Sequence, residues 1–101
     1  MSNLTSRDDV RVYFQRQESI LTDIEGEEDI QIMLAKHKSS LFKMDNLLDL
    51  YERKLKEAST APEIRTAIKQ IRLTLFMKKE CMRLIKKIKQ RVIEVQRKNY
   101  N

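Results

Sequence analysis

The sequence predicts an all-α protein, folded as an up-down-up antiparallel three-helix bundle or coiled coil with a short first helix and long second and third helices. One glycine and one proline in 101 residues leave few turn positions, which argues against a multi-stranded sheet. Apolar residues also recur at steps of three and four over long stretches, as in helices that bury one face. This length has room for about one core, so we expect a single helical domain over residues 1–101.

The first helix is expected over about residues 6–25. Ser6 can cap its start, with Asp9 at the third helical position facing the positive end of the helix. Gly26 is expected to close the helix in the left-handed conformation that glycine tolerates. The apolar stripe comprises Val10, Tyr13, Phe14, Ile20 or Leu21, and Ile24, and Gln17 interrupts it.

The second helix is expected over about residues 27–58, and it carries the most regular heptad pattern of the chain. Its start is loaded with carboxylates, which the positive end of a helix favours. The seam positions are Ile30, Leu34, His37, Leu41, Met44, Leu48, Tyr51, Leu55 and Ala58. His37 is expected to face the core with a hydrogen-bond partner that helps to fix the helix register, and the alternative is a pH-dependent polar insert. On the first reading, His37→Leu should be neutral or stabilising.

The third helix is expected over about residues 61–98. Thr60 and Glu63 match the T-x-x-E capping box, and Pro62 is tolerated in a first helical turn. Two apolar stripes follow, displaced around the helix: Ile64, Ile68, Ile71 and Leu75 form one, and Leu73, Met77, Cys81, Leu84, Ile88, Val92 and Val95 form the other. Because the centre of this helix is apolar over more than one face, a single neighbouring helix cannot cover it.

The unequal helix lengths predict a binding site. At ~1.5 Å per residue the first helix is about 30 Å long, against about 48 Å and about 55 Å for the others. It therefore leaves the far half of the hairpin uncovered, and we expect an exposed apolar groove there that binds a helix from a second copy or from a different protein. The expected partner-binding residues are Leu47, Leu48, Tyr51 and Leu55 of the second helix, which we expect to face Ile64, Ile68, Ile71 and Leu75 of the third helix, together with Phe76.

Charge is distributed unevenly along the chain. Residues 1–60 carry nine basic and twelve acidic side chains, whereas residues 61–101 carry twelve basic and three acidic ones. In the antiparallel layout the acidic segment 23–29 lies beside the basic end of the third helix and offsets part of its charge. The outward basic face comprises Lys78, Lys79, Arg83, Lys86, Lys87 and Lys98, which are candidate contacts for phosphate or an acidic partner. A solvated bundle face is the simplest interpretation, nucleic-acid binding is the alternative, and an anionic membrane surface is disfavoured because the core uses the apolar face.

The sequence offers little for catalysis or for metal binding. It has one histidine and one cysteine, without a phosphate loop, a G-x-S-x-G motif or a CxxC pair, so we expect no enzyme activity, no catalytic residues, no cofactor and no metal site. Cys81 is expected to be a buried core thiol. Asp45, Asp49 and Glu52 share a helix face at a spacing that suits a cation or a partner's arginine, but a solvated face is the simpler interpretation.

These features predict a non-enzymatic protein–protein interaction module, a small helical adaptor or subunit of a larger assembly. No apolar run approaches the roughly 20 residues that span a bilayer, and Met1 to Thr22 lacks the apolar segment of a secretory signal. We therefore expect a soluble intracellular protein of the cytoplasm. The lone cysteine is compatible with such a reducing compartment.

Overall fold

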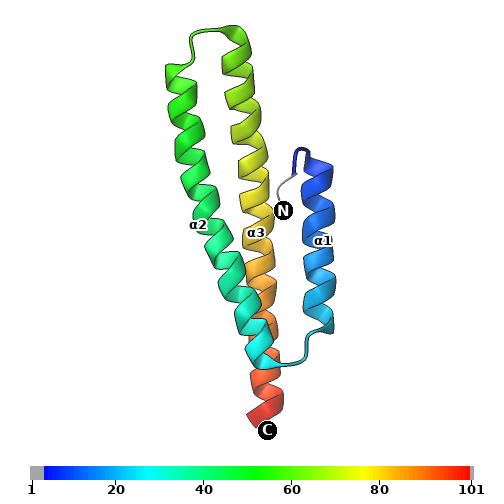
Figure 1. Cartoon of the computed structure of the whole chain (residues 1–101). Coiled ribbons are helices and arrows are strands. Elements are labelled where there is room, and N and C mark those ends of the chain that lie inside the picture. The colour runs from blue at the N-terminus through cyan, green and yellow to red at the C-terminus, as the bar shows by residue number, and fades with distance from the viewer. Residues whose placement is uncertain (1–3, 101) are drawn as a thin grey trace.

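The computed structural model describes residues 4–100, which form three helices. They are α1 (Arg7–Asp23), α2 (Glu27–Glu57) and α3 (Ala61–Tyr100). Figure 1 shows α1 running antiparallel to α2, and α2 antiparallel to α3. The molecule measures 62 × 22 × 17 Å, and α3 sets its length, because 40 residues at ~1.5 Å each span about 60 Å. The predicted all-α class, with a short first helix and two long ones, is confirmed.

Side chains cap the starts of α1 and α3 as the sequence predicted. The Ser6 hydroxyl accepts a hydrogen bond from the backbone N–H of Asp9 at 3.1 Å. The Thr60 hydroxyl accepts one from the N–H of Glu63 at 3.4 Å and donates one to the Glu63 carboxylate at 2.7 Å. Each cap satisfies a backbone donor that has no partner within the helix, which fixes where the helix begins.

The connection between α1 and α2 differs from the prediction. Gly26 was expected in the left-handed conformation, but its φ of −77° and ψ of 129° are extended, and it stands immediately before α2. That prediction was wrong because α1 ends earlier, where Ile24 takes an extended conformation and its N–H bonds the carbonyl of Ile20. The Ile24 carbonyl in turn accepts a hydrogen bond from Arg91 of α3 at 3.2 Å, which places a cation at the negative end of α1.

The core lies in the half of the molecule where all three helices meet. Half of its buried apolar residues come from α3, which packs against both other helices. They are Val10, Phe14 and Leu21 of α1, Ile30, Met33 and Met44 of α2, and Cys81, Leu84, Ile85, Ile88, Val92 and Val95 of α3.

A single heptad seam on α3 faces α2 along the whole hairpin. Its members recur every seven residues, and none is more than 5% exposed: Ala67, Thr74, Cys81, Ile88 and Val95. The stripe of large residues from Ile64 to Leu75 was instead expected to face α2. The small side chains of Ala67 and Thr74 occupy that seam because small residues let two helices approach closely, a signal that a search for large apolar residues misses.

Candidate helix-docking surface

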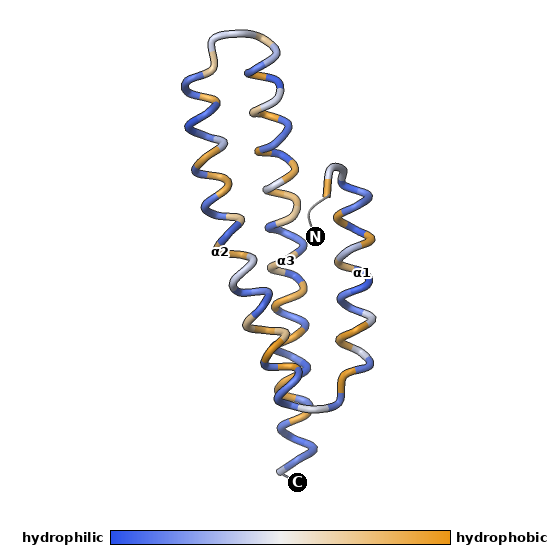
Figure 2. The backbone as a smooth tube through the Cα atoms, viewed as in Figure 1, coloured by the Kyte–Doolittle hydropathy of each residue, from blue (hydrophilic) through white to orange (hydrophobic). Residues whose placement is uncertain are grey.

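The N-terminal end of α1 lies level with Phe76, near the middle of α3. The guanidinium carbons of Arg7 and Arg11 lie 5.3 and 5.5 Å from the centre of the Phe76 ring. Beyond this level α2 and α3 continue as a two-helix layer, as Figure 1 shows. Figure 2 shows apolar residues recurring along both helices in this uncovered half. The uncovered half is thus the part of the hairpin that lacks a third helix.

The predicted partner-binding residues of α2 differ in their exposure. Leu48 is buried in the seam at 8% exposure, Tyr51 and Leu55 are half-buried, and Leu47 is 36% exposed. Leu47 and Tyr51 line a pocket together with Tyr13 of α1. They therefore lie on the same side of the hairpin as α1, which covers that side in the three-helix half.

The predicted partner-binding residues of α3 also differ in their exposure. Ile64 and Leu75 are 38% and 51% exposed, Ile68 and Ile71 are half-buried, and Phe76 lies half-buried under the two arginines of α1. Because Ala67 and Thr74 fill the seam, Ile64 and Leu75 do not lie in the contact with α2. Ile68 lines a different pocket from that of Leu47 and Tyr51. The structure therefore divides the expected single groove between two faces of the hairpin.

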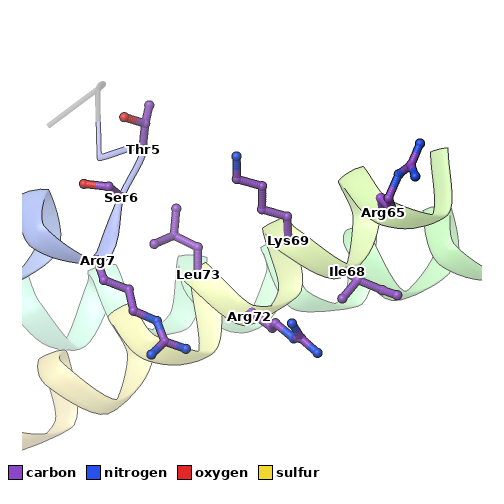
Figure 3. A pocket seen from close by; sticks show the side chains of 8 residues that line it. All are labelled: Thr5, Ser6, Arg7, Arg65, Ile68, Lys69, Arg72 and Leu73. Carbon is purple, nitrogen blue, oxygen red and sulfur yellow. The ribbon is translucent and has the colours of Figure 1, made fainter. Parts of the chain in front are cut away.

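A basic pocket lies between the N-terminal end of α1 and the outer face of α3. It is about 610 Å³ in volume. Its lining is Thr5, Ser6, Arg7, Arg65, Ile68, Lys69, Arg72 and Leu73, shown as sticks in Figure 3. The three cations of α3 recur at i, i+4 and i+7, which places them on one helix face. These three cations were not among the predicted contacts, although the absence of any Asp or Glu from residue 64 to residue 79 indicates an unbalanced basic segment.

The predicted basic face of α3 is partly neutralised. Lys78 pairs with Asp45 of α2 at 2.7 Å, and Lys87 pairs with Glu18 of α1 at 2.8 Å, so these two lysines tie helices together. Arg83 lies 3.6 Å from Glu80 in the preceding turn. The remaining members of the predicted face are exposed: Lys79, Lys86 and Lys98.

The acidic connection between α1 and α2 lies beside α3, as the antiparallel layout requires. Glu27 accepts a hydrogen bond from the side-chain amide of Gln96 at 2.9 Å. Arg91 bonds the Ile24 carbonyl and lies 3.5 Å from Glu94 of its own helix. Contact between this connection and α3 is therefore made by hydrogen bonds in addition to long-range charge attraction.

A small polar group lies inside the three-helix half. His37 is 1% exposed, and its Nε2 lies 3.1 Å from Oε1 of Gln17. The Cys81 thiol donates to the backbone carbonyl of His37 at 3.4 Å. Burial lowers the pKa of His37, with Lys36 adding to the effect, and burial raises the pKa of Cys81 to about 11. A thiol with that pKa is protonated at neutral pH, so Cys81 is placed as a packing residue and not as a nucleophile.

The three acidic residues Asp45, Asp49 and Glu52 of α2 do not converge on a cation site in the structure. Asp45 pairs with Lys78, while Asp49 and Glu52 lie beside Arg53 and Lys56. Within residues 4–100, no three His, Cys, Asp or Glu side chains come together in a way that would hold a metal ion. Among the described helices, none is long and apolar enough to cross a membrane.

Comparison with known proteins finds no matching family model, no matching curated protein and no matching solved structure. The function is therefore argued from the surfaces of the chain itself.

Proposed function

We propose that this chain is a non-enzymatic protein–protein interaction module that docks a partner helix on the uncovered half of the α2–α3 hairpin. One observation carries the proposal: the N-terminal end of α1 lies level with Phe76, while α2 and α3 continue together to the loop at residues 58–60. A two-helix layer leaves both sides of its seam open to water, and a third helix is the usual way to cover such a side.

The exposed residues of this half support the proposal energetically. Leu47, Ile64 and Leu75 are between 36% and 51% exposed, and Tyr51 and Ile68 are half-buried. Full burial of a large aliphatic side chain contributes about 1.5–3 kcal/mol, so covering even part of several such residues favours binding by several kcal/mol. Exposed apolar residues also occur in the three-helix half, where Ile32 and Phe42 of α2 are 61% and 68% exposed, so the proposal rests on the missing third helix and not on exposure alone.

The test is a double substitution that acts on both faces of the uncovered half. Tyr51→Asp with Ile68→Asp should abolish assembly, measured as the mass of the purified chain by light scattering and as its elution position in a native extract. Helix content and the burial of Cys81 should be retained, because the three-helix core lies elsewhere. If the double variant keeps the mass and the elution position of the parent, the uncovered half is not the docking site.

The second candidate function is nucleic-acid binding through the outer face of α3. It is favoured by the run from residue 64 to residue 79, which holds five basic residues and no acidic one. Titration with a labelled duplex at two salt concentrations separates the two functions, because binding through phosphates weakens steeply with salt and apolar helix docking does not.

A further inference from the structure

The outer face of α3 carries a second heptad row, distinct from the seam that packs against α2. The row begins at Arg65 and follows alternating steps of three and four to Lys86, so its members lie along one side of the helix. Apolar and cationic residues alternate along it. The apolar members are Ile68, Leu75 and Met82, and the cationic members are Arg65, Arg72, Lys79 and Lys86. We call this row the outer seam.

The outer seam is open to solvent along its whole length. Leu75 and Met82 are 51% and 53% exposed, Ile68 is half-buried, and the four cations are exposed. Heptad spacing of apolar residues on an exposed face is the pattern of a helix that packs against another helix. The three-helix core does not use these positions, so the pattern has no explanation within the monomer.

The charge of the outer seam has no counterpart in the chain. Within residues 4–100, none of its four cations forms an ion pair with a carboxylate. Arg7 and Lys69 add two further charges at one end, where they line the basic pocket with Arg65, Ile68 and Arg72. In Figure 3 the side chains of Arg7 from α1 and of the cations from α3 lie around the apolar side chains of Ile68 and Leu73, which both belong to α3. A ligand that covers the apolar members must therefore bring negative charge.

We infer that the outer seam binds an amphipathic helix of a second protein whose contact face alternates apolar and acidic residues at heptad spacing. This inference rests on the proposed function, specifies the chemistry of the partner, and extends its contact from the uncovered half past Phe76 to Lys86 along the outer face of α3. The partner's apolar residues cover Ile68, Leu75 and Met82, and its carboxylates lie opposite the cations between them, as flanking charges do in coiled coils.

Charge opposes a second copy of this chain that would dock its own outer seam here. A two-fold contact between outer seams would place four cations against four cations, and like charges brought together oppose association. The outward side of α2 near its exposed Ile32 and Phe42 carries both signs of charge: Lys36, Lys38 and Lys43 lie among these residues, and of the nearby carboxylates Asp45 already pairs with Lys78.

The apolar members of the outer seam favour a helix over nucleic acid. A phosphate backbone is bound by cations, hydroxyls and amides, and it gains nothing from exposed aliphatic residues every seven positions. A helix partner uses both kinds of residue at this spacing. Nucleic acid and an anionic membrane thus become outcomes of the test.

The experiment uses a labelled synthetic four-heptad peptide with Leu and Glu alternating on one face, and measures its affinity for the full chain by fluorescence anisotropy. The control peptide carries Lys at every Glu position. We expect the acidic peptide to bind and the basic one to fail. Arg72→Glu with Lys79→Glu should weaken binding of the acidic peptide by at least about tenfold, since opposed charge pairs become like-charge pairs.

Two further variants locate the contact. Lys36→Glu with Lys43→Glu makes the same charge change at the same spacing on α2, and it should alter the affinity by less than about twofold. Leu75→Ser with Met82→Ser removes two exposed apolar side chains and should also weaken binding by about tenfold, with unchanged helix content. Equal losses in the α2 and α3 charge variants would overturn the inference, because the peptide would then be sensing net charge alone.

Other outcomes separate this inference from the proposed function. The inference fails if the basic peptide binds as well as the acidic one. It also fails if neither peptide binds but a 20-base-pair duplex or phosphatidylserine vesicles do, and if that binding is lost when Arg72 and Lys79 are replaced. If the acidic peptide does not bind while the parent chain still assembles in a manner sensitive to Tyr51→Asp, the docking proposal stands and the inference falls. Self-association that depends on Arg72 and Lys79 would overturn the choice of partner.

Discussion

His37 of α2 and Gln17 of α1 contact each other, with His37 Nε2 and Gln17 Oε1 3.1 Å apart. Each is the polar residue that interrupts the apolar stripe of its own helix. Since the amide oxygen only accepts, the neutral ring donates through its Nε2–H. A shift of α1 by one turn would remove Gln17 from this position and would leave a buried ring without a partner, which is costly. The pair therefore favours one register of α1 on α2.

Substituting the two partners should have unequal effects. Gln17→Leu leaves His37, which is 1% exposed, without its hydrogen bond, and we expect a loss of about 1–3 kcal/mol in the free energy of unfolding. His37→Leu leaves Gln17, which is half-buried and within reach of water, so that variant should be neutral or slightly stabilising. Urea denaturation of each variant measures the difference.

The double variant Gln17→Leu with His37→Leu is the control, because replacing both partners by apolar residues removes the unpaired group. Its stability should match or exceed that of the parent. A double variant as unstable as Gln17→Leu alone would mean that the hydrogen bond itself, and not the unpaired ring, accounts for the loss.

The buried histidine also predicts how stability changes with pH. Burial lowers the pKa of His37 in the folded chain relative to the unfolded chain, so the unfolded chain binds a proton more readily. Its contribution to stability is present above the unfolded value of about 6.5 and is lost as the pH falls through the lower folded pKa. Thermal unfolding between pH 7 and pH 5 should show a decrease that is smaller in His37→Leu. Equal slopes in the two proteins would show that His37 does not titrate with folding.

Much of the fold can be predicted from the sequence, because the signals that mark a helix, its apolar spacing and its capping residues, lie close together in the chain. The heptad pattern of α2 and the caps at Ser6 and Thr60 are all read within a few residues. The register between helices is not local. Gly26 illustrates this limit, since the end of α1 is fixed by Arg91, which lies 67 positions beyond Ile24.

The candidate site was harder to predict than the fold. Large apolar residues of α3 were expected in the seam with α2, but Ala67 and Thr74 occupy it, and Ile64 and Leu75 face outward. Side-chain size and burial are separate properties, and a pattern based on size favours the wrong face wherever small residues line a close contact. The cations Arg65, Lys69 and Arg72 were not predicted as contacts, because basic residues are more widely spaced there than in the dense run after residue 77.

Cys81 should be unreactive in the folded protein. It is fully buried, and burial raises its pKa to about 11, so the thiol stays protonated at pH 8. Its reaction with Ellman's reagent should be slow in buffer and should become fast in the urea range where the helices unfold. Rapid labelling of the native chain would show that α1 detaches easily from α2 and α3.

Charge reversal at the start of α2 tests how the acidic connection contributes. Glu27→Lys, Glu28→Lys and Asp29→Lys together remove favourable charge from the first turn of α2 and place cations near Arg91 and the basic end of α3. We expect a loss of stability that is larger at 20 mM salt than at 500 mM, because screening weakens repulsion between exposed charges. A loss that is the same at both salt concentrations would show that the hydrogen bond between Glu27 and Gln96 matters more than charge.

The position of Ala67 in the seam gives a direct test of how α3 is rotated against α2. Ala67 is 3% exposed, whereas its neighbour Thr66 is exposed. Ala67→Phe should force the hairpin apart and cost about 1–3 kcal/mol in the free energy of unfolding, because a close-packed contact has no room for a ring. Thr66→Phe places the same ring in solvent and should change stability by less than about 0.5 kcal/mol. If the two variants are equally stable, α3 is rotated so that the stripe from Ile64 to Leu75 faces α2, and the outer seam is then no longer an open surface.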